Sequence, residues 1–204
     1  MSATPYSRFL ASMSMDLDRW RDGCGHDLAA LAEATDAERE AIESLLLSRP
    51  TEDWRDVEAL ALLDSPRARD RLLSLAHGSH RAIALAVIAY APHLVDRETT
   101  DQQIVAALDH GEQTEVVARA IDLAERFPTP CVIEALIRAL ARADRPTAYD
   151  LIATLLTIQG TITDLWDLTA RPMILSLLDD LTASDPVRSD AARNSLRARC
   201  SRPA

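Results

Sequence analysis

Residues 82–91 read Ala-Ile-Ala-Leu-Ala-Val-Ile-Ala-Tyr-Ala, and one tyrosine hydroxyl is their only polar side-chain group. A helix of this composition is apolar on every face, so other elements must cover it. A helix that crosses a bilayer needs about 20 apolar residues, and this run is much shorter. We therefore predict a helix that lies in a protein core and is surrounded by neighbouring helices.

Signals for helix ends recur along the rest of the chain. Thr35 and Glu38 have the spacing of a capping box, in which each side chain bonds a free backbone amide. Ser65-Pro66 and Thr129-Pro130 place a capping hydroxyl before a proline in the first turn. With apolar spacing, these signals predict helices over about 35–49, 54–64, 66–78, 82–91, 104–111, 112–127, 130–140, 146–160, 172–181 and 186–199. Residues 96–101 are expected to form a polar connection, and residues 161–170 a turn of helix and a loop.

The helices repeat with a period of 33 or 34 residues. Leu75-Ala-His-Gly78 recurs as Leu108-Asp-His-Gly111, and Trp-Arg-Asp occurs at 20–22 and again at 54–56. Repeats of this length cannot bury their apolar faces alone, so they stack. We predict an all-α fold: a right-handed α-solenoid of about five helix pairs that spans residues 1–204 as a single domain. Residues 1–20 are expected to be either a flexible leader or a docking arm.

Composition excludes several chemistries. All 22 basic residues are arginine, and there are only five glycines. A P-loop and a Schiff-base enzyme both need a lysine, and a dinucleotide fold needs a glycine-rich turn that cannot be written here. The three cysteines form no Cys-x-x-Cys pair, which favours a reducing cytoplasm over a disulfide scaffold. The amino terminus lacks the apolar core of a secretory signal, so we expect no membrane association.

The formal net charge is −10, and 14 of the 32 acidic residues lie within residues 1–64. This balance argues against nucleic acid, which requires a clustered basic surface. Beyond Pro186 the sign inverts, because Arg188, Arg193, Arg197, Arg199 and Arg202 face a single Asp190. An acidic amino-terminal third would instead attract a basic protein.

The possible metal and catalytic residues have simpler explanations. His77-Gly-Ser-His80 and Cys24-Gly-His26 each bring two ligand types together, but no third or fourth ligand lies nearby in sequence. His77 and His110 occupy matching helix ends, where a histidine interacts well with the helix dipole. Adjacent acids such as Asp179-Asp180 diverge on a helix. We therefore expect no metal, no cofactor and no catalysis.

A family resemblance adds to these patterns. Asp185-Pro186-Val187-Arg188, followed by Ala191-Ala192 and Leu196, resembles the second helix of a short HEAT-like repeat. The amino-terminal motifs resemble bacterial HEAT-like proteins, some of which are immunity partners of secreted toxins. These motifs are Trp20-Arg21-Asp22-Gly23, His26-Asp27-Leu28, Glu38-Arg39 and the run that begins Trp54-Arg55-Asp56-Val57-Glu58. The resemblance covers nearly the whole chain, although a scaffold of this kind serves many partners.

The resemblance implies a cytoplasmic immunity protein, monomeric when free, that binds and neutralises a basic toxin domain. The alternative is a regulatory or assembly adaptor. Trp20 and Trp54 are either core fillers or exposed anchors of a binding surface. A polar stripe at 115, 119, 122 and 126 offers a second surface. The candidate partner-binding residues are Trp20, Asp22, Asp27, Trp54, Asp56, Glu58, Glu115, Arg119 and Asp122.

Overall fold

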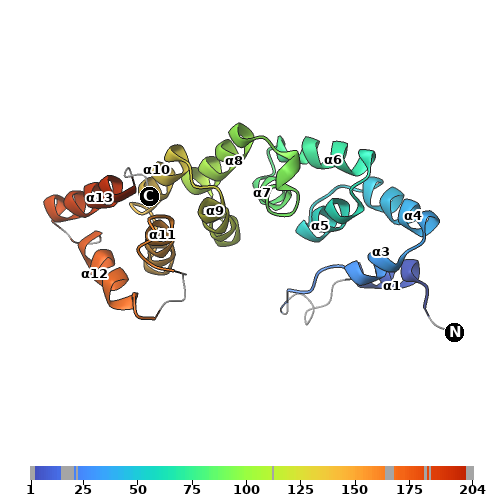
Figure 1. Ribbon diagram of the computed structural model, residues 1–204, viewed down its shortest axis with the longest axis horizontal. Coiled ribbons are helices and arrows are strands. Elements are labelled where there is room, and N and C mark those ends of the chain that lie inside the picture. Colours follow the sequence, from blue (N-terminus) through green and yellow to red (C-terminus); the bar gives the residue numbers. More distant parts are fainter. Residues whose placement is uncertain are drawn as a thin grey trace. The chain divides into compact units, whose positions relative to one another are not determined.

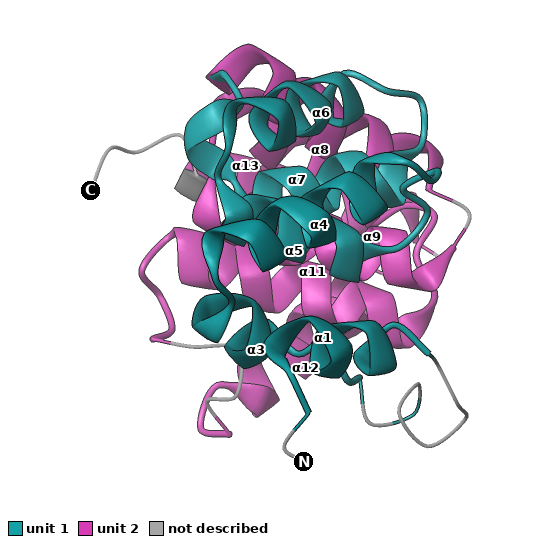
Figure 2. Ribbon diagram, turned by 90° about the vertical axis from the view of Figure 1, so that its right-hand side faces the viewer, with its two compact units in different colours: residues 1–96 teal, residues 97–204 magenta. Residues whose placement is uncertain are grey.

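The computed structural model describes residues 3–14, 21, 23–111, 113–163, 168–181, 183 and 185–200. Throughout these residues the regular structure is helical and no strand is formed, which confirms the all-α prediction (Figure 1). The sequence predicted one repeat domain. That stays a prediction, and within the chain the helices gather into two compact units, Met1–Asp96 and Arg97–Ala204 (Figure 2).

The first unit is built from two rows of helices. Its elements are α1 (Pro5–Ser12), α3 (Leu28–Glu33), α4 (Asp36–Leu47), α5 (Trp54–Leu63), α6 (Pro66–Ala76), α7 (Arg81–Tyr90) and a 3-10 turn, η1 (Pro92–Leu94). Helix α4 packs on α6 and α5 packs on α7, while α1 and α3 pack on each other. Helix α1 also contacts α4, so the part of residues 1–20 that forms α1 is packed into this unit.

Helix α7 confirms the prediction for residues 82–91. Its residues from Ile83 to Ile88 are all buried, with exposed fractions of 2% or less. Ala82, Ala89 and Tyr90 are only half-buried, so the helix is covered on every side in its middle and not at its ends. The small alanines let neighbouring helices approach closely, which suits a chain with few aromatic residues.

Local capping chemistry sets the helix starts. The Thr35 hydroxyl accepts from the Glu38 amide, and the Glu38 carboxylate accepts from the Thr35 amide, so the capping box is present at α4. The Ser65 hydroxyl accepts from the Ala68 amide at the start of α6. Each bond satisfies a backbone group that the helix itself leaves free.

The second unit has a similar arrangement. Its helices are α8 (Arg97–His110), α9 (Thr114–Arg126), α10 (Pro130–Ala139), α11 (Arg145–Ile158), α12 (Arg171–Leu181) and α13 (Pro186–Cys200). One row contains α8, α10 and α13; the other contains α9, α11 and α12. Consecutive helices also pack across the rows, as α8 does on α9 and α12 on α13.

The expected polar connection at residues 96–101 is wrong, because α8 already begins at Arg97. Its first turns look polar in sequence, but Thr99 and Thr100 are buried there and serve as packing residues. Gly111 ends the helix as predicted. A Cβ at this position would lie 2.4 Å from the carbonyl oxygen of Ala107, which only a glycine avoids.

Arginine side chains join the helices within each unit. Arg39 donates to the carbonyl oxygens of Leu31 and Leu63 in the first unit. In the second, Arg197 of α13 donates to both carboxylate oxygens of Glu134 in α10, at 3.0 and 2.7 Å. The planar guanidinium suits such paired contacts better than an ammonium would.

Among the described residues, no helix is long and apolar enough to cross a bilayer.

Candidate functional site

Two of the predicted partner-binding residues, Trp20 and Asp22, lie outside the described residues. Asp27 is the N-cap of α3, where its carboxylate accepts from the Ala30 amide at 2.8 Å. It also forms an ion pair with Arg8 of α1 at 3.2 Å. Asp27 therefore ties two helices together in addition to being partly exposed.

Asp56 lies at the centre of a buried ionic cluster. It was expected on a partner-binding surface, but only 2% of its surface is exposed. Its Oδ1 lies 2.8 Å from Nε2 of His26, and one terminal nitrogen of Arg49 lies 2.6 and 2.7 Å from its two oxygens. Its carboxylate joins α5 to the end of α4 and to the segment before α3. From this position Asp56 supports the fold and cannot reach a partner.

The charges in this cluster follow from its contacts. Burial by itself would raise the pKa of Asp56, but the hydrogen bonds from His26 and Arg49 outweigh it, and the pKa is lowered. The carboxylate therefore stays charged. Nδ1 of His26 is buried and finds no hydrogen-bond partner among the described residues. The His26 ring also packs beside Phe9, with ring centroids 5.3 Å apart.

An aromatic pair lies next to this cluster. The rings of Trp54 and Tyr90 are stacked, with centroids 6.0 Å apart and planes inclined by 14°. Both side chains are half-buried, so Trp54 is at once a core filler and accessible from solvent. Glu58 is one helical turn further along α5. Burial raises the pKa of Glu58, and the charge of His26 offsets this only in part.

The predicted polar stripe lies on α9, where Glu115, Asp122 and Arg126 are exposed. Arg119 is half-buried, with its guanidinium 3.9 Å from the Glu115 carboxylate. Desolvation raises the pKa of Asp122, and nearby Arg119 counteracts this. Arg126, at the end of the stripe, has its guanidinium carbon 5.5 Å from the centre of the Phe127 ring.

Helix α11 adds a carboxylate to this surface. The pKa of Asp150 is raised by desolvation first and then by the charges of Asp122 and Asp144. Helices α9 and α11 pack on each other, so the charge of Asp122 acts on Asp150. We call Glu115, Asp122 and Asp150 the α9–α11 acidic face. Asp150 was not predicted, because tertiary packing brings α11 next to α9.

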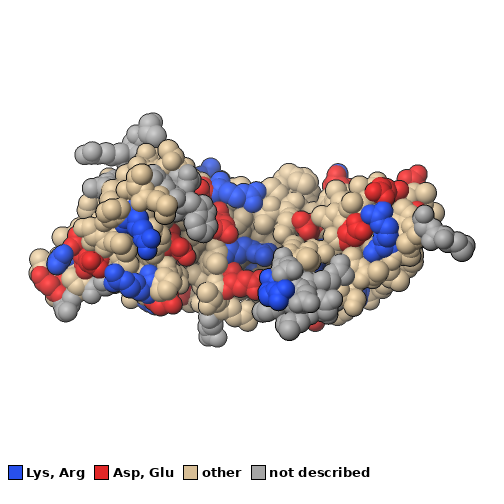
Figure 3. Space-filling view, turned by 90° about the horizontal axis from the view of Figure 1, so that it is seen from below, with Lys and Arg blue, Asp and Glu red and all other residues tan. Residues whose placement is uncertain are grey.

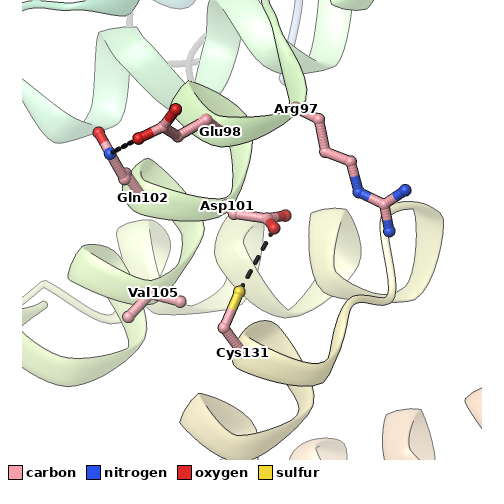
Figure 4. Close-up of a pocket in the computed structure, with 6 residues that line it drawn as sticks. All are labelled: Arg97, Glu98, Asp101, Gln102, Val105 and Cys131. Carbon is pink, nitrogen blue, oxygen red and sulfur yellow. Dashed lines mark hydrogen bonds between the residues drawn. The ribbon is translucent and has the colours of Figure 1, made fainter.

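A pocket of about 560 Å³ opens between α8 and α10 (Figure 4). Its lining residues are Arg97, Glu98, Asp101, Gln102, Val105 and Cys131. Asp101 and Cys131 point toward each other from the two helices, and the thiol donates to Oδ2 of Asp101 at 3.3 Å. The other oxygen of Asp101 is buried, and no described residue bonds to it. None of these residues was predicted. Asp101 and Cys131 are 30 residues apart, so no local sequence pattern indicates that they meet.

Charges are interspersed across the face shown in Figure 3, where arginines adjoin acidic side chains. The ion pairs explain this pattern: Arg8 lies 2.6 Å from Glu33, and Arg138 lies 2.6 Å from Asp109. Among the described residues no group of three His, Cys, Asp or Glu side chains is arranged to hold a metal ion. His77 and His110 lie at the carboxyl ends of α6 and α8, as predicted.

Comparison with known proteins adds no relative: no family model, no curated protein and no solved structure matches this chain.

Proposed function

We propose that this chain is a non-catalytic scaffold whose helix pairs form a right-handed, HEAT-like α-solenoid, and that it binds a basic protein partner in the cytoplasm. The packing of alternate helices into rows within each unit supports the stacking. Such stacking leaves one helix of every pair with a long solvent-facing side. That side is where a scaffold of this kind binds its partner.

The α9–α11 acidic face carries the proposal for a basic partner. The described residues supply Asp122 and Asp150 with no hydrogen bond. After desolvation, repulsion from the charges of Asp122 and Asp144 raises the pKa of Asp150, while nearby Arg119 partly offsets the desolvation of Asp122. A cationic side chain from a partner would relieve that repulsion. Asp109 of α8, by contrast, is paired with Arg138.

The more specific proposal is an immunity protein that neutralises a secreted toxin. It is supported by the resemblance of the amino-terminal motifs and by the overall charge of −10, which suits a basic toxin domain. Acidic inhibitors of basic enzymes gain speed of association from charge and affinity from a few buried anchors.

Capture of the partner from the native host tests this function. The tagged chain is expressed in its own organism, cross-linked, purified at low salt and analysed by mass spectrometry. We expect a protein with a basic carboxyl-terminal domain, encoded next to this chain's gene, whose toxicity disappears when the two are coexpressed. The proposal is wrong if the captured protein remains equally toxic in the presence of this chain.

A further inference from the structure

We propose that Trp54 and Glu58 form a receptor for one guanidinium group, an arginine side chain on the surface of the protein partner. This inference rests on the proposed function, because it names the chemistry by which the first unit would hold a basic partner. It concerns residues of the first unit, whereas the α9–α11 acidic face belongs to the second unit.

The aromatic half of the receptor is held rigidly. Tyr90 stacks on Trp54 with an inclination of 14°, and both side chains pack against the core of the first unit. Trp54 therefore keeps one orientation while part of its surface meets solvent. Tryptophan is the aromatic side chain that binds cations best, and guanidinium groups are its most frequent cationic neighbours in proteins.

The acidic half is the Glu58 carboxylate, which forms no ion pair with any described residue and is attracted only through space by His26. Its neighbours on the same helix are all paired: Asp53 binds Arg55 at 2.6 Å and Asp56 binds Arg49 at 2.6 Å. The described residues provide Glu58 with no hydrogen bond and no arginine, although it is partly buried. A carboxylate that loses hydration without gaining a cation is unfavourable in the free protein. A bound guanidinium would correct this.

The two halves are adjacent. A Cβ built on Gly25 would lie 3.2 Å from Oε2 of Glu58 and 3.7 Å from the nearest carbon of the Trp54 ring. The carboxylate and the edge of the ring therefore lie next to each other, with the Gly25 backbone against both. A ligand that contacts both groups must approach them from the solvent side, where each is partly exposed. A guanidinium suits this geometry, because it can stack its plane on an aromatic ring while its N–H groups bond a carboxylate.

The Gly25 backbone lies against the Glu58 carboxylate and the edge of the Trp54 ring. Any larger residue would bring its Cβ to 3.2 Å from Oε2 of Glu58, which is tighter than an ordinary contact. The side chain would then compete with a ligand for the same oxygen. This explains the presence of glycine at a position where its backbone conformation is not unusual.

Fluorine NMR on protein labelled with 5-fluorotryptophan tests the receptor. The Trp54 resonance is assigned as the one missing from Trp54→Phe, and ethylguanidinium chloride is titrated in at constant ionic strength. Ethylurea, which has nearly the same shape and no charge, is the matched ligand control. A single ring contact and one ion pair predict saturation at roughly tens of millimolar.

We expect a saturable shift of the Trp54 resonance with ethylguanidinium and none with ethylurea. Glu58→Gln should weaken binding about three- to tenfold, because it removes the charge and keeps the shape. Glu40→Gln, an equal change at an exposed position in the same unit, should leave binding unaltered. Circular dichroism first verifies that each variant is folded.

The receptor is overturned if ethylurea shifts the resonance as strongly as ethylguanidinium, if no saturable shift occurs, or if Glu58→Gln binds like the wild type. None of these results decides the proposed function, because the captured partner would still be neutralised. Conversely, a captured protein that remains toxic would contradict the proposed function. It would not change the result of the guanidinium titration, which concerns the first unit alone.

Discussion

Asp56 is more deeply buried than Glu58, the other acidic residue of α5. Its carboxylate is nearly excluded from water, yet it receives hydrogen bonds from His26 and from Arg49. Removing one partner from such a cluster destabilises the folded protein by more than the intact cluster stabilises it. The remaining charged groups then stay buried, without water and without a partner. The side chain of Arg49 is 38% exposed and can recover some water, which limits the cost.

Asp56→Ala should therefore destabilise the protein by about 3 kcal/mol, near the lower end for a broken buried ion pair. Urea denaturation followed by circular dichroism measures the change. Asp70→Ala is the matched control, because Asp70 is exposed on α6 and its replacement should change the free energy of unfolding by less than about 0.5 kcal/mol. Equal destabilisation by the two substitutions would contradict the cluster.

The stability supplied by Asp56 should also depend on pH. Its pKa is lower in the folded chain than in the unfolded chain, so the folded state binds the proton less tightly. The contribution is fully present above about pH 4, the ordinary pKa of aspartate, and it is lost as pH falls through the lower folded value. The stability difference between wild type and Asp56→Asn should accordingly shrink below that pH. A difference that grows on acidification would contradict this assignment.

Three acidic residues show what could not be predicted from the sequence alone. Asp27, Asp56 and Glu58 look alike in sequence, as acids near a tryptophan. The structure makes Asp27 a helix cap, buries Asp56 in an ionic cluster and gives Glu58 no hydrogen bond or ion pair with a described residue. Those differences arise from which helix packs against each carboxylate, and no local pattern records them.

At the scale of elements, helix ends were the most predictable feature. The signals at Thr35, Ser65 and Thr129 act within four residues, so they could be identified without knowing the fold. The start of α8 was missed because its threonines are buried by tertiary packing. The pairing of Trp54 with Tyr90 was missed for the same reason, since it joins α5 to α7.

Helix α7 is the element on which the first unit depends most. Val87→Asp would place an unpaired charge at a fully buried position and should cost several kcal/mol, about enough to unfold the unit. Ala82→Asp is the matched control, because Ala82 lies half-buried in the first turn of the same helix. An acid there interacts favourably with the helix dipole. Thermal melting distinguishes the two variants. A Val87→Asp protein that melts within a few degrees of wild type would contradict the central role of α7 in the core.

At the scale of the whole molecule, the two units carry different candidate surfaces. The first unit holds the proposed guanidinium receptor at Trp54 and Glu58, and the second holds the α9–α11 acidic face. The excess of acidic residues could be read from the sequence, but the acids that lack partners could not. A basic partner attracted by the net charge would be positioned by those unpaired acids.

The most direct test of this account is the rate at which the captured basic partner associates with the chain, measured by stopped flow at low and high salt. Asp122→Arg with Asp150→Arg should slow association about tenfold or more at low salt, and the effect should diminish as salt screens it. Glu40→Arg with Asp70→Arg changes the net charge equally at exposed positions elsewhere, so it should slow association much less. Equal rates for the two double variants would contradict the assignment of the partner to the α9–α11 acidic face.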